Sequence, residues 1–186
     1  MKQVNFVVFA VICLLISSCS SNYVSNQESS NRISLGQNES LSLPPPSSIS
    51  KIANHSFLVT LTTQEKTIPI QINTDQQTSY MLGFTSWGTR SLTLSYSNNK
   101  IFINDINALS NINTDYKKIF LALLMTQIND NEWFKYNPKI NILTKSHIKY
   151  IYKNKKLLLS ISKSKETYHI KFNQSTELSD IVVNII

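Results

Sequence analysis

Residues 148–172 read IKYIYKNKKLLLSISKSKETYHIKF, and this stretch decides the fold class that the sequence predicts. Apolar side chains recur at every second position, which is typical of strands with one buried face. A two-residue turn at Asn154-Lys155 would pair Tyr152 with Leu157, Tyr150 with Leu159 and Ile148 with Ile161. A four-residue turn over residues 163–166 would pair Ile161 with Tyr168 and Leu159 with Ile170. The stretch therefore predicts three antiparallel strands, whose other face carries His147, Lys149, Lys153, Lys156, His169 and Lys171.

The same alternation runs through residues 57–103 and predicts an antiparallel meander with one apolar face. Pro69 would lie on the opposite face of its strand, which suggests an edge position or a bulge. A last strand is predicted from about residue 178 to residue 186. The expected apolar face carries Phe57, Val59, Leu61, Ile68, Ile70, Ile72, Tyr80, Leu82, Phe84, Leu92, Leu94, Tyr96, Ile101 and Ile103.

The hydrophobic period changes from two to that of a helix between these two groups of strands. Thr114 is a plausible N-cap and Asp115 suits the first turn. The apolar stripe from Tyr116 to Ile128 is widened by Leu121 and Met125. We therefore predict a mainly β fold with one principal α-helix, in which a curved antiparallel sheet forms an incomplete β-barrel around a central helix.

The N-terminus has the features of a bacterial lipoprotein signal. Lys2 precedes an apolar run, and the sequence Ile16-Ser17-Ser18-Cys19 provides an aliphatic residue, two small residues and a cysteine. We expect residues 1–18 to be a signal peptide and Cys19 to carry the lipid. Ser20 is not the aspartate typical of inner-membrane retention, so the outer membrane is expected, with the protein facing the periplasm. An ordinary signal peptide with a chance cysteine is the alternative.

Residues 19–50 are rich in Ser, Asn and Gln, and Pro44-Pro45-Pro46 lies near their end. This composition predicts a disordered tether behind the lipid anchor. Residues 51–186 are then expected to form a single β-rich domain, and we expect a monomer.

Composition limits the chemistry that the mature chain can perform. Removal of the signal and lipidation of Cys19 leave no thiol for a disulfide or a metal site. His55, His147 and His169 stand alone, and no catalytic or metal-ligand spacing is present. We therefore expect no enzymatic activity, no metal and no cofactor.

Charge is concentrated in the last third of the chain. Ten lysines and a single acid, Glu166, lie between Lys135 and Lys171. Such a surface suits anionic headgroups of a membrane, and the expected compartment makes nucleic acid an unsuitable partner. The candidate headgroup contacts are Lys149, Lys153, Lys156 and Lys171.

The expected apolar face could line a cavity for a lipid or an acyl chain. The alternative is a close-packed core, which is the usual fate of such side chains. The candidate cavity residues are Phe57, Val59, Leu61, Ile70, Tyr80, Leu82, Phe84, Trp87, Leu92, Leu94, Phe120 and Leu124.

Three features carry a resemblance to a known family. They are the strand Gly88-Thr89-Arg90-Ser91-Leu92-Thr93-Leu94-Ser95-Tyr96, the Leu-rich helix from Tyr116 to Ile128 and the closing strand with paired aliphatic residues. They resemble the uncharacterised outer-membrane lipoproteins of aryl-polyene and fatty-acid-synthase-like gene clusters. That family is similar in architecture to the lipoprotein carriers LolA and LolB, so the resemblance implies binding of a lipid or an acyl chain.

Two functions follow from these expectations. The first is an outer-membrane lipoprotein that binds or carries a hydrophobic ligand at the membrane surface. The second is an interaction or assembly lipoprotein of the pilotin kind, with a dry core and a protein partner. An apolar-lined hollow would favour the first function, whereas a filled core with an exposed apolar patch would favour the second.

Overall fold

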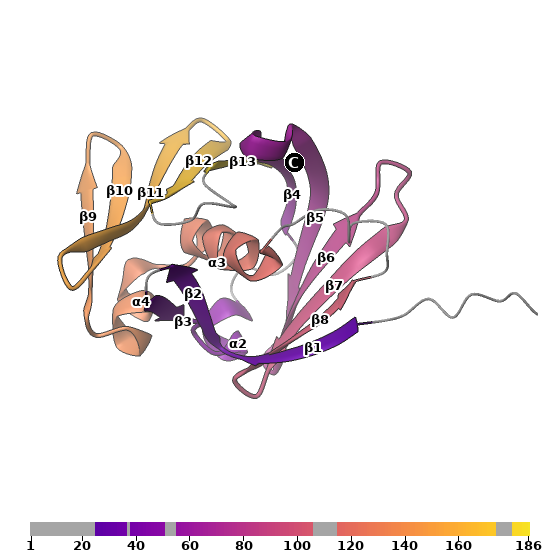
Figure 1. Ribbon diagram of the computed structural model, residues 1–186, viewed down its shortest axis with the longest axis horizontal. Helices are drawn as coiled ribbons and strands as arrows, with labels where there is room; N and C mark the ends of the chain where they lie inside the picture. The colour runs from indigo at the N-terminus through magenta and orange to yellow at the C-terminus, as the bar shows by residue number, and fades with distance from the viewer. Residues whose placement is uncertain (1–24, 37, 51–54, 106–114, 174–179) are drawn as a thin grey trace, which may run out of the picture.

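The computed structural model describes residues 25–36, 38–50, 55–105, 115–173 and 180–186. Eleven strands form one curved antiparallel sheet in the order β1-β8-β7-β6-β5-β4-β13-β12-β11-β10-β9 (Figure 1). Among the described residues β1 and β9 do not pair with each other, so the sheet is open. The strands are β1 (Ser25–Ser30), β4 (His55–Leu61), β5 (Lys66–Thr74), β6 (Thr78–Phe84), β7 (Arg90–Ser97), β8 (Lys100–Asp105), β9 (Ile140–Lys145), β10 (Ile148–Lys153), β11 (Lys156–Ser164), β12 (Thr167–Phe172) and β13 (Asp180–Ile185).

The predicted meander is present, but the prediction for β6 is wrong by one residue. Ile72 pairs with Met81 and Ile70 pairs with Gly83, so Met81 faces the core while Tyr80, Leu82 and Phe84 face outward. Two backbone N–H groups, of Gln77 and Thr78, donate to Asp75 Oδ1 at 2.7 and 2.6 Å and fix the turn. The isoleucines of β5 point toward the core. The register that this turn sets therefore determines which side chains of β6 point toward the core.

The C-terminal strands are also present, with a register that differs from the prediction. Tyr152 pairs with Leu157 as predicted, but a β-bulge follows and Ile151 pairs with Leu159. Leu158 and Leu159 are both buried at this bulge, so Ile151 rather than Tyr150 faces the core. The next turn has two residues instead of four, because Ser164 pairs with Thr167. Ile161 therefore pairs with Ile170 rather than Tyr168, and Leu159 pairs with Phe172 rather than Ile170.

The prediction of a disordered tether over residues 19–50 is wrong for its described part. Besides β1, this part forms a hairpin of β2 (Arg32–Gly36) and β3 (Glu39–Ser42), followed by α2 (Pro46–Ile49). Residues 19–24 lie outside the described residues. Short period-two patterns supply four buried side chains that the polar composition conceals, Ile33, Leu35, Leu41 and Leu43, and α2 adds Ile49.

The β2–β3 hairpin is tied to the large sheet by polar contacts. The hydroxyl of Tyr96 on β7 donates to the carbonyl of Leu43 at 3.3 Å. Burial raises the pKa of Tyr96 above its ordinary value of 10.0. The N–H of Asn31 also donates to the carbonyl of Asn99 at 3.0 Å. The structured region therefore begins well before residue 51.

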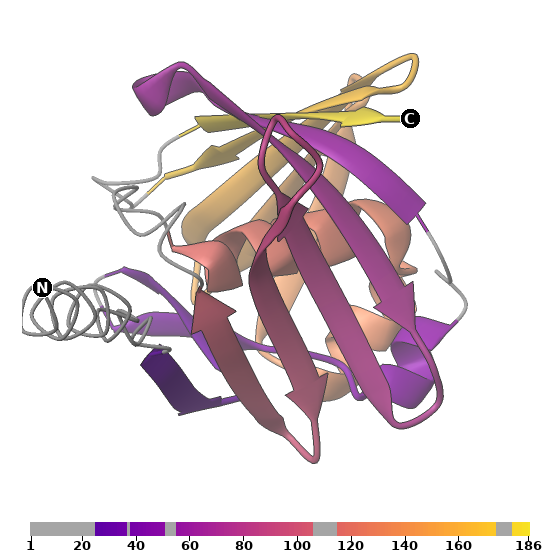
Figure 2. The same ribbon diagram turned by 90° about the vertical axis from the view of Figure 1, so that its right-hand side faces the viewer.

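Two helices follow the first group of strands. In α3 (Tyr116–Gln127) eight of the twelve residues are buried, and the helix lies between the two halves of the curved sheet (Figures 1 and 2). Its N-cap is Asp115 rather than Thr114, since the Asp115 side chain accepts from the N–H of Lys118. The second helix, α4 (Asp130–Tyr136), was not predicted. Asn129 caps its N-terminus, and Trp133 is the side chain that the helix buries. None of the described helices is long and apolar enough to span a bilayer.

A core role for the β2–β3 hairpin predicts that Leu41→Ala destabilises the protein. Leu41 is fully buried, so the loss should be about 2–5 kcal/mol in the free energy of unfolding measured by urea denaturation. Ser34→Ala, at an exposed position of the same hairpin, is the control and should change stability by less than about 0.5 kcal/mol. Equal stability of Leu41→Ala and the wild type would mean that the hairpin is detached from the core in solution.

Candidate functional site

The structure brings together eight of the twelve predicted cavity residues. Each is at most 2% exposed, and all belong to one continuous cluster of buried side chains. None of them is among the residues that line four surface hollows in the described part of the chain. The space that these residues share is therefore filled by side chains, as in a packed core. The eight are Phe57, Val59, Leu61, Ile70, Leu92, Leu94, Phe120 and Leu124.

The other four predicted cavity residues lie elsewhere, and the prediction that they share the inner face is wrong. Tyr80, Leu82 and Phe84 point outward from β6 because of the register described above. Trp87 lies in the loop between β6 and β7 and is 92% exposed. These side chains define a different surface, on the outside of the sheet.

A fifth side chain, Phe102 on β8, belongs to that surface and was not predicted. It is 40% exposed, close to the 38% of Tyr80, and both residues pair with Ser95 on β7. The sequence pattern could have identified Phe102. Ile101 and Ile103 are expected on the inner face, and alternate side chains of a strand point to opposite faces, so Phe102 points outward. We call Tyr80, Leu82, Phe84, Trp87 and Phe102 the aromatic outer face.

The strand residues beside Tyr80 and Leu82 carry no charge, whereas Phe84 pairs with Arg90 and Phe102 pairs with Glu28 at the margins of the aromatic outer face. Tyr80 pairs with Asn73 and Ser95, and Leu82 pairs with Gln71 and Thr93. A surface with several large exposed apolar side chains and an uncharged centre is typical of a contact with a protein or a membrane.

The Trp87 loop has a defined backbone. The N–H of Thr85 donates to the carbonyl of Thr89 at 2.9 Å, and the N–H of Gly88 donates to the carbonyl of Thr85 at 3.0 Å. The N–H of Thr89 also donates to Thr85 Oγ1 at 3.2 Å. Gly88 has a φ of +77°, a conformation that glycine adopts without steric cost. These hydrogen bonds fix the conformation of the turn that exposes Trp87.

The Trp87 loop and the start of the described chain lie at the same end of the sheet. Ser25, the first residue of β1, pairs with Asp105, and Asp105 pairs with Leu92 near the start of β7. Cys19 lies outside the described residues, six positions before Ser25. Six residues span at most about 20 Å, so an anchor at Cys19 would stay near this end of the sheet.

The predicted headgroup lysines divide into two pairs. Lys149 and Lys153 lie on the inner side of β10 with Ile151. The prediction that they point outward is therefore wrong, because it did not include the bulge in β11. Lys149 Nζ donates to Asp130 Oδ1 at 2.6 Å, and Lys153 Nζ donates to the carbonyl of Ser40 at 2.6 Å. Lys156 and Lys171 are exposed and remain candidates for headgroup contact.

No group of His, Cys, Asp and Glu in the described part of the chain could hold a metal ion. His147 and His169 are exposed, and His169 pairs with Ser162 on β11.

Comparison with known proteins identifies no family for this chain. No protein-family model matches the sequence, and no curated protein sequence is significantly similar to it. Function must therefore be argued from the surfaces themselves.

The packed inner side predicts the effect of Leu94→Trp. Leu94 is fully buried between Met81 and Ile103 on the neighbouring strands, so the larger side chain should overpack the core. We expect a loss of about 1–3 kcal/mol in the free energy of unfolding, measured by urea denaturation.

The matched control for this variant is Thr93→Trp, since the adjacent side chain points to the outer face. It should leave stability within about 0.5 kcal/mol of the wild type. A Leu94→Trp protein as stable as the wild type would instead reveal free space inside the sheet, as an acyl-chain carrier requires.

Proposed function

We propose that this protein is a lipid-anchored outer-membrane lipoprotein that binds lipid at the membrane surface through its aromatic outer face. The main support for the proposal is the exposure of Trp87. Its side chain lies on a hydrogen-bonded loop at the end of the sheet nearest the proposed anchor at Cys19. Lipid binding then occurs on the outside of the sheet, because the side chains of the expected cavity pack against one another.

The chemistry of the aromatic outer face suits the boundary between water and lipid. Trp and Tyr have an apolar ring with one polar group, and both are enriched where headgroups meet acyl chains. Burial of one large apolar side chain contributes about 1.5–3 kcal/mol. A weak contact of this size becomes effective when an anchor already holds the protein beside the membrane.

The arrangement of the sheet around α3 is part of the same proposal. An open antiparallel sheet that curves around α3 as a central helix is the arrangement implied by the resemblance to the LolA and LolB carriers. The packed inner side argues against a permanent acyl-chain cavity, so we place this protein beside the carriers in architecture and apart from them in how it binds lipid. The outer membrane is proposed because Ser20 follows the lipidated cysteine.

A second candidate function is that of an interaction or assembly lipoprotein with a protein partner. Tyr80 and Phe102 favour it, because both stand in the middle of strands rather than at the loop tip. Large apolar side chains on a sheet face also suit a protein surface. Vesicle binding separates the two functions, since a surface made for a protein partner need not bind lipid.

The proposal predicts that Cys19→Ser abolishes stable membrane attachment. A single loop contact is reversible, whereas a diacylglyceryl thioether with a further acyl chain holds firmly. The wild type should stay in the membrane fraction through repeated washes and carry the added lipid mass. A processed Cys19→Ser protein that stays with the membrane through the same washes would place the anchor elsewhere.

Trp87 should report lipid contact by its fluorescence. The chain has two tryptophans, and Trp133 is already buried, so a blue shift on addition of phosphatidylglycerol vesicles would come from Trp87. The unlipidated Cys19→Ser protein should show this shift, and adding Trp87→Ala should weaken vesicle binding about tenfold. Leu143→Ala, which removes a 51% exposed side chain from β9, is the matched control. Unchanged Trp87 emission at saturating lipid would leave the protein partner as the function.

A further inference from the structure

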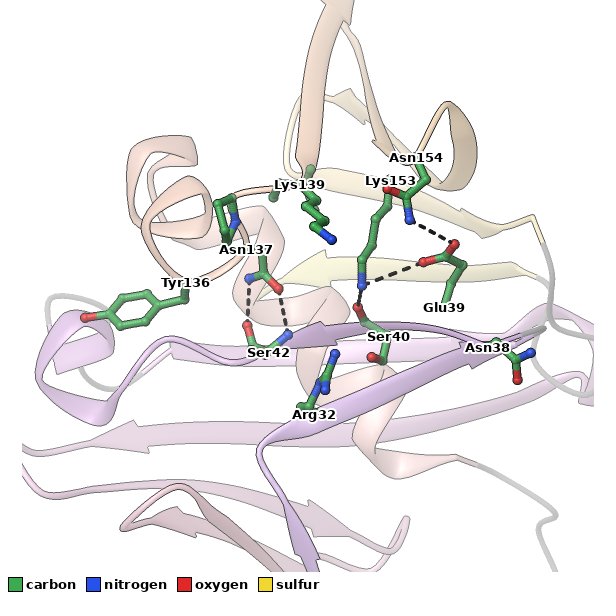
Figure 3. Close-up of a pocket in the computed structure, with 12 residues that line it drawn as sticks. Arg32, Asn38, Glu39, Ser40, Ser42, Tyr136, Asn137, Lys139, Lys153 and Asn154 are labelled. Carbon is green, nitrogen blue, oxygen red and sulfur yellow. Dashed lines mark hydrogen bonds and ion pairs between the residues drawn. The ribbon is translucent and has the colours of Figure 1, made fainter.

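A polar hollow lies where three separated parts of the chain meet. The β2–β3 hairpin, the segment after α4 and the turn between β10 and β11 enclose a volume of about 370 Å³ (Figure 3). Most of its lining is polar, and three basic side chains contribute to it: Arg32, Lys139 and Lys153. This composition differs from that of the aromatic outer face.

The frame of this pocket is fixed by side-chain contacts. Asn137 pairs with the backbone of Ser42 as a strand would: its Oδ1 accepts from the N–H at 2.8 Å and its Nδ2 donates to the carbonyl at 2.9 Å. Nδ2 also lies 3.3 Å from the carbonyl of Trp133. Asn137 is buried, so these contacts join the hairpin to the end of α4 and hold two walls in place.

One of the three basic groups is already neutralised. Lys153 Nζ lies 3.6 Å from Glu39 Oε2, and both side chains are largely buried. Asn154 Nδ2 donates to the other carboxylate oxygen of Glu39 at 3.5 Å. The only acidic residue of the lining is therefore paired with Lys153.

Arg32 and Lys139 have no ion-pair partner among the described residues. Arg32 begins β2 and Lys139 precedes β9, and both are exposed. Figure 3 shows the two side chains pointing toward the same space from opposite walls. The pocket thus carries a net charge of two positive units, one from each group.

We propose that this pocket binds a phosphate monoester carried on a small polar molecule, such as a sugar phosphate. A phosphate monoester has a charge of about −1.5 to −2 at neutral pH, which matches the two unpaired cations. A guanidinium binds two phosphate oxygens at once, and an ammonium adds a compact charge. A carboxylate would balance only one of the two groups.

The size and the remaining lining indicate the rest of the ligand. At roughly 30 Å³ for each water-sized group, about 370 Å³ holds about twelve of them, so a phosphate and part of a sugar fit inside and the remaining atoms extend through the open mouth of the pocket. Asn38, Ser40 and Asn154 offer amide and hydroxyl groups around this space, and Tyr136 offers a ring. Hydroxyl groups of a sugar suit such a lining.

The pocket is independent of the proposed membrane contact. Arg32 follows Ser30, which pairs with Lys100 at the turn between β7 and β8, whereas the Trp87 loop lies at the other end of β7. The eight residues of β7 span about 27 Å. A protein that rests its Trp87 loop on the membrane would hold this pocket away from that surface.

The proposal is tested by calorimetry on the full-length, unlipidated Cys19→Ser protein with glucose 6-phosphate as the probe. We expect glucose 6-phosphate to bind at least tenfold more tightly than glucose or glucuronate, and less tightly at high salt. Arg32→Gln and Lys139→Gln should each weaken binding about tenfold. Lys145→Gln removes the same charge from an exposed position outside the pocket and should change the affinity less than twofold.

A phosphate monoester could also belong to a lipid headgroup, so a second arm uses vesicles that contain phosphatidic acid. Binding of either probe that depends on both Arg32 and Lys139 supports the pocket and identifies the source of the phosphate. Trp87→Ala should leave glucose 6-phosphate binding unchanged, which separates this site from the membrane contact. Absence of binding by both probes, or equal weakening by Lys145→Gln, would overturn the proposal.

Discussion

The need to cover α3 on more than one side governs the rest of this structure. Eight of its twelve residues are buried, so the helix has no broad polar stripe to turn toward water. A flat sheet can cover one face of a helix, and only a curved sheet or a second layer can cover the remainder. The eleven-stranded sheet supplies the curvature, and the β2–β3 hairpin adds cover, since β2 contacts α3 directly.

This requirement explains why a polar N-terminal segment is ordered. Ser, Asn and Gln dominate its composition, yet Ile33, Leu35 and Leu41 are buried. A few apolar side chains at alternate positions suffice when they close a core that already exists. The same hairpin then exposes its polar positions, and one of them, Arg32, becomes part of the pocket beside α4.

The aromatic outer face and the polar pocket have opposite chemistry, and the Trp87 loop and the pocket lie at opposite ends of β7. The aromatic outer face has an uncharged centre around Tyr80 and Leu82, and its most exposed side chain, Trp87, lies near the start of β1. The polar pocket has two unpaired cations in a frame held by Asn137. A lipoprotein anchored at Cys19 could thus face the membrane with one end and a soluble ligand with the other.

The sequence by itself determined the element types, because period two and the helical period are local properties of the chain. It placed the strands of the meander and those from Ile148 onward, the helix from Tyr116, and Phe57 and Leu94 on one apolar face, but it missed β9 and left open whether that face lines a cavity or fills a core. It also contains the pattern Ile16-Ser17-Ser18-Cys19, four adjacent residues from which we propose the lipid anchor. Tertiary structure decided which of two apolar faces is buried. In β6 the turn at Asp75 turned Met81 inward and Tyr80 outward, and in β11 one extra residue at the bulge put Lys149 and Lys153 on the inner side. A shift of one residue reverses every side chain of a strand, and turns and bulges set that shift through contacts that no hydrophobic pattern specifies.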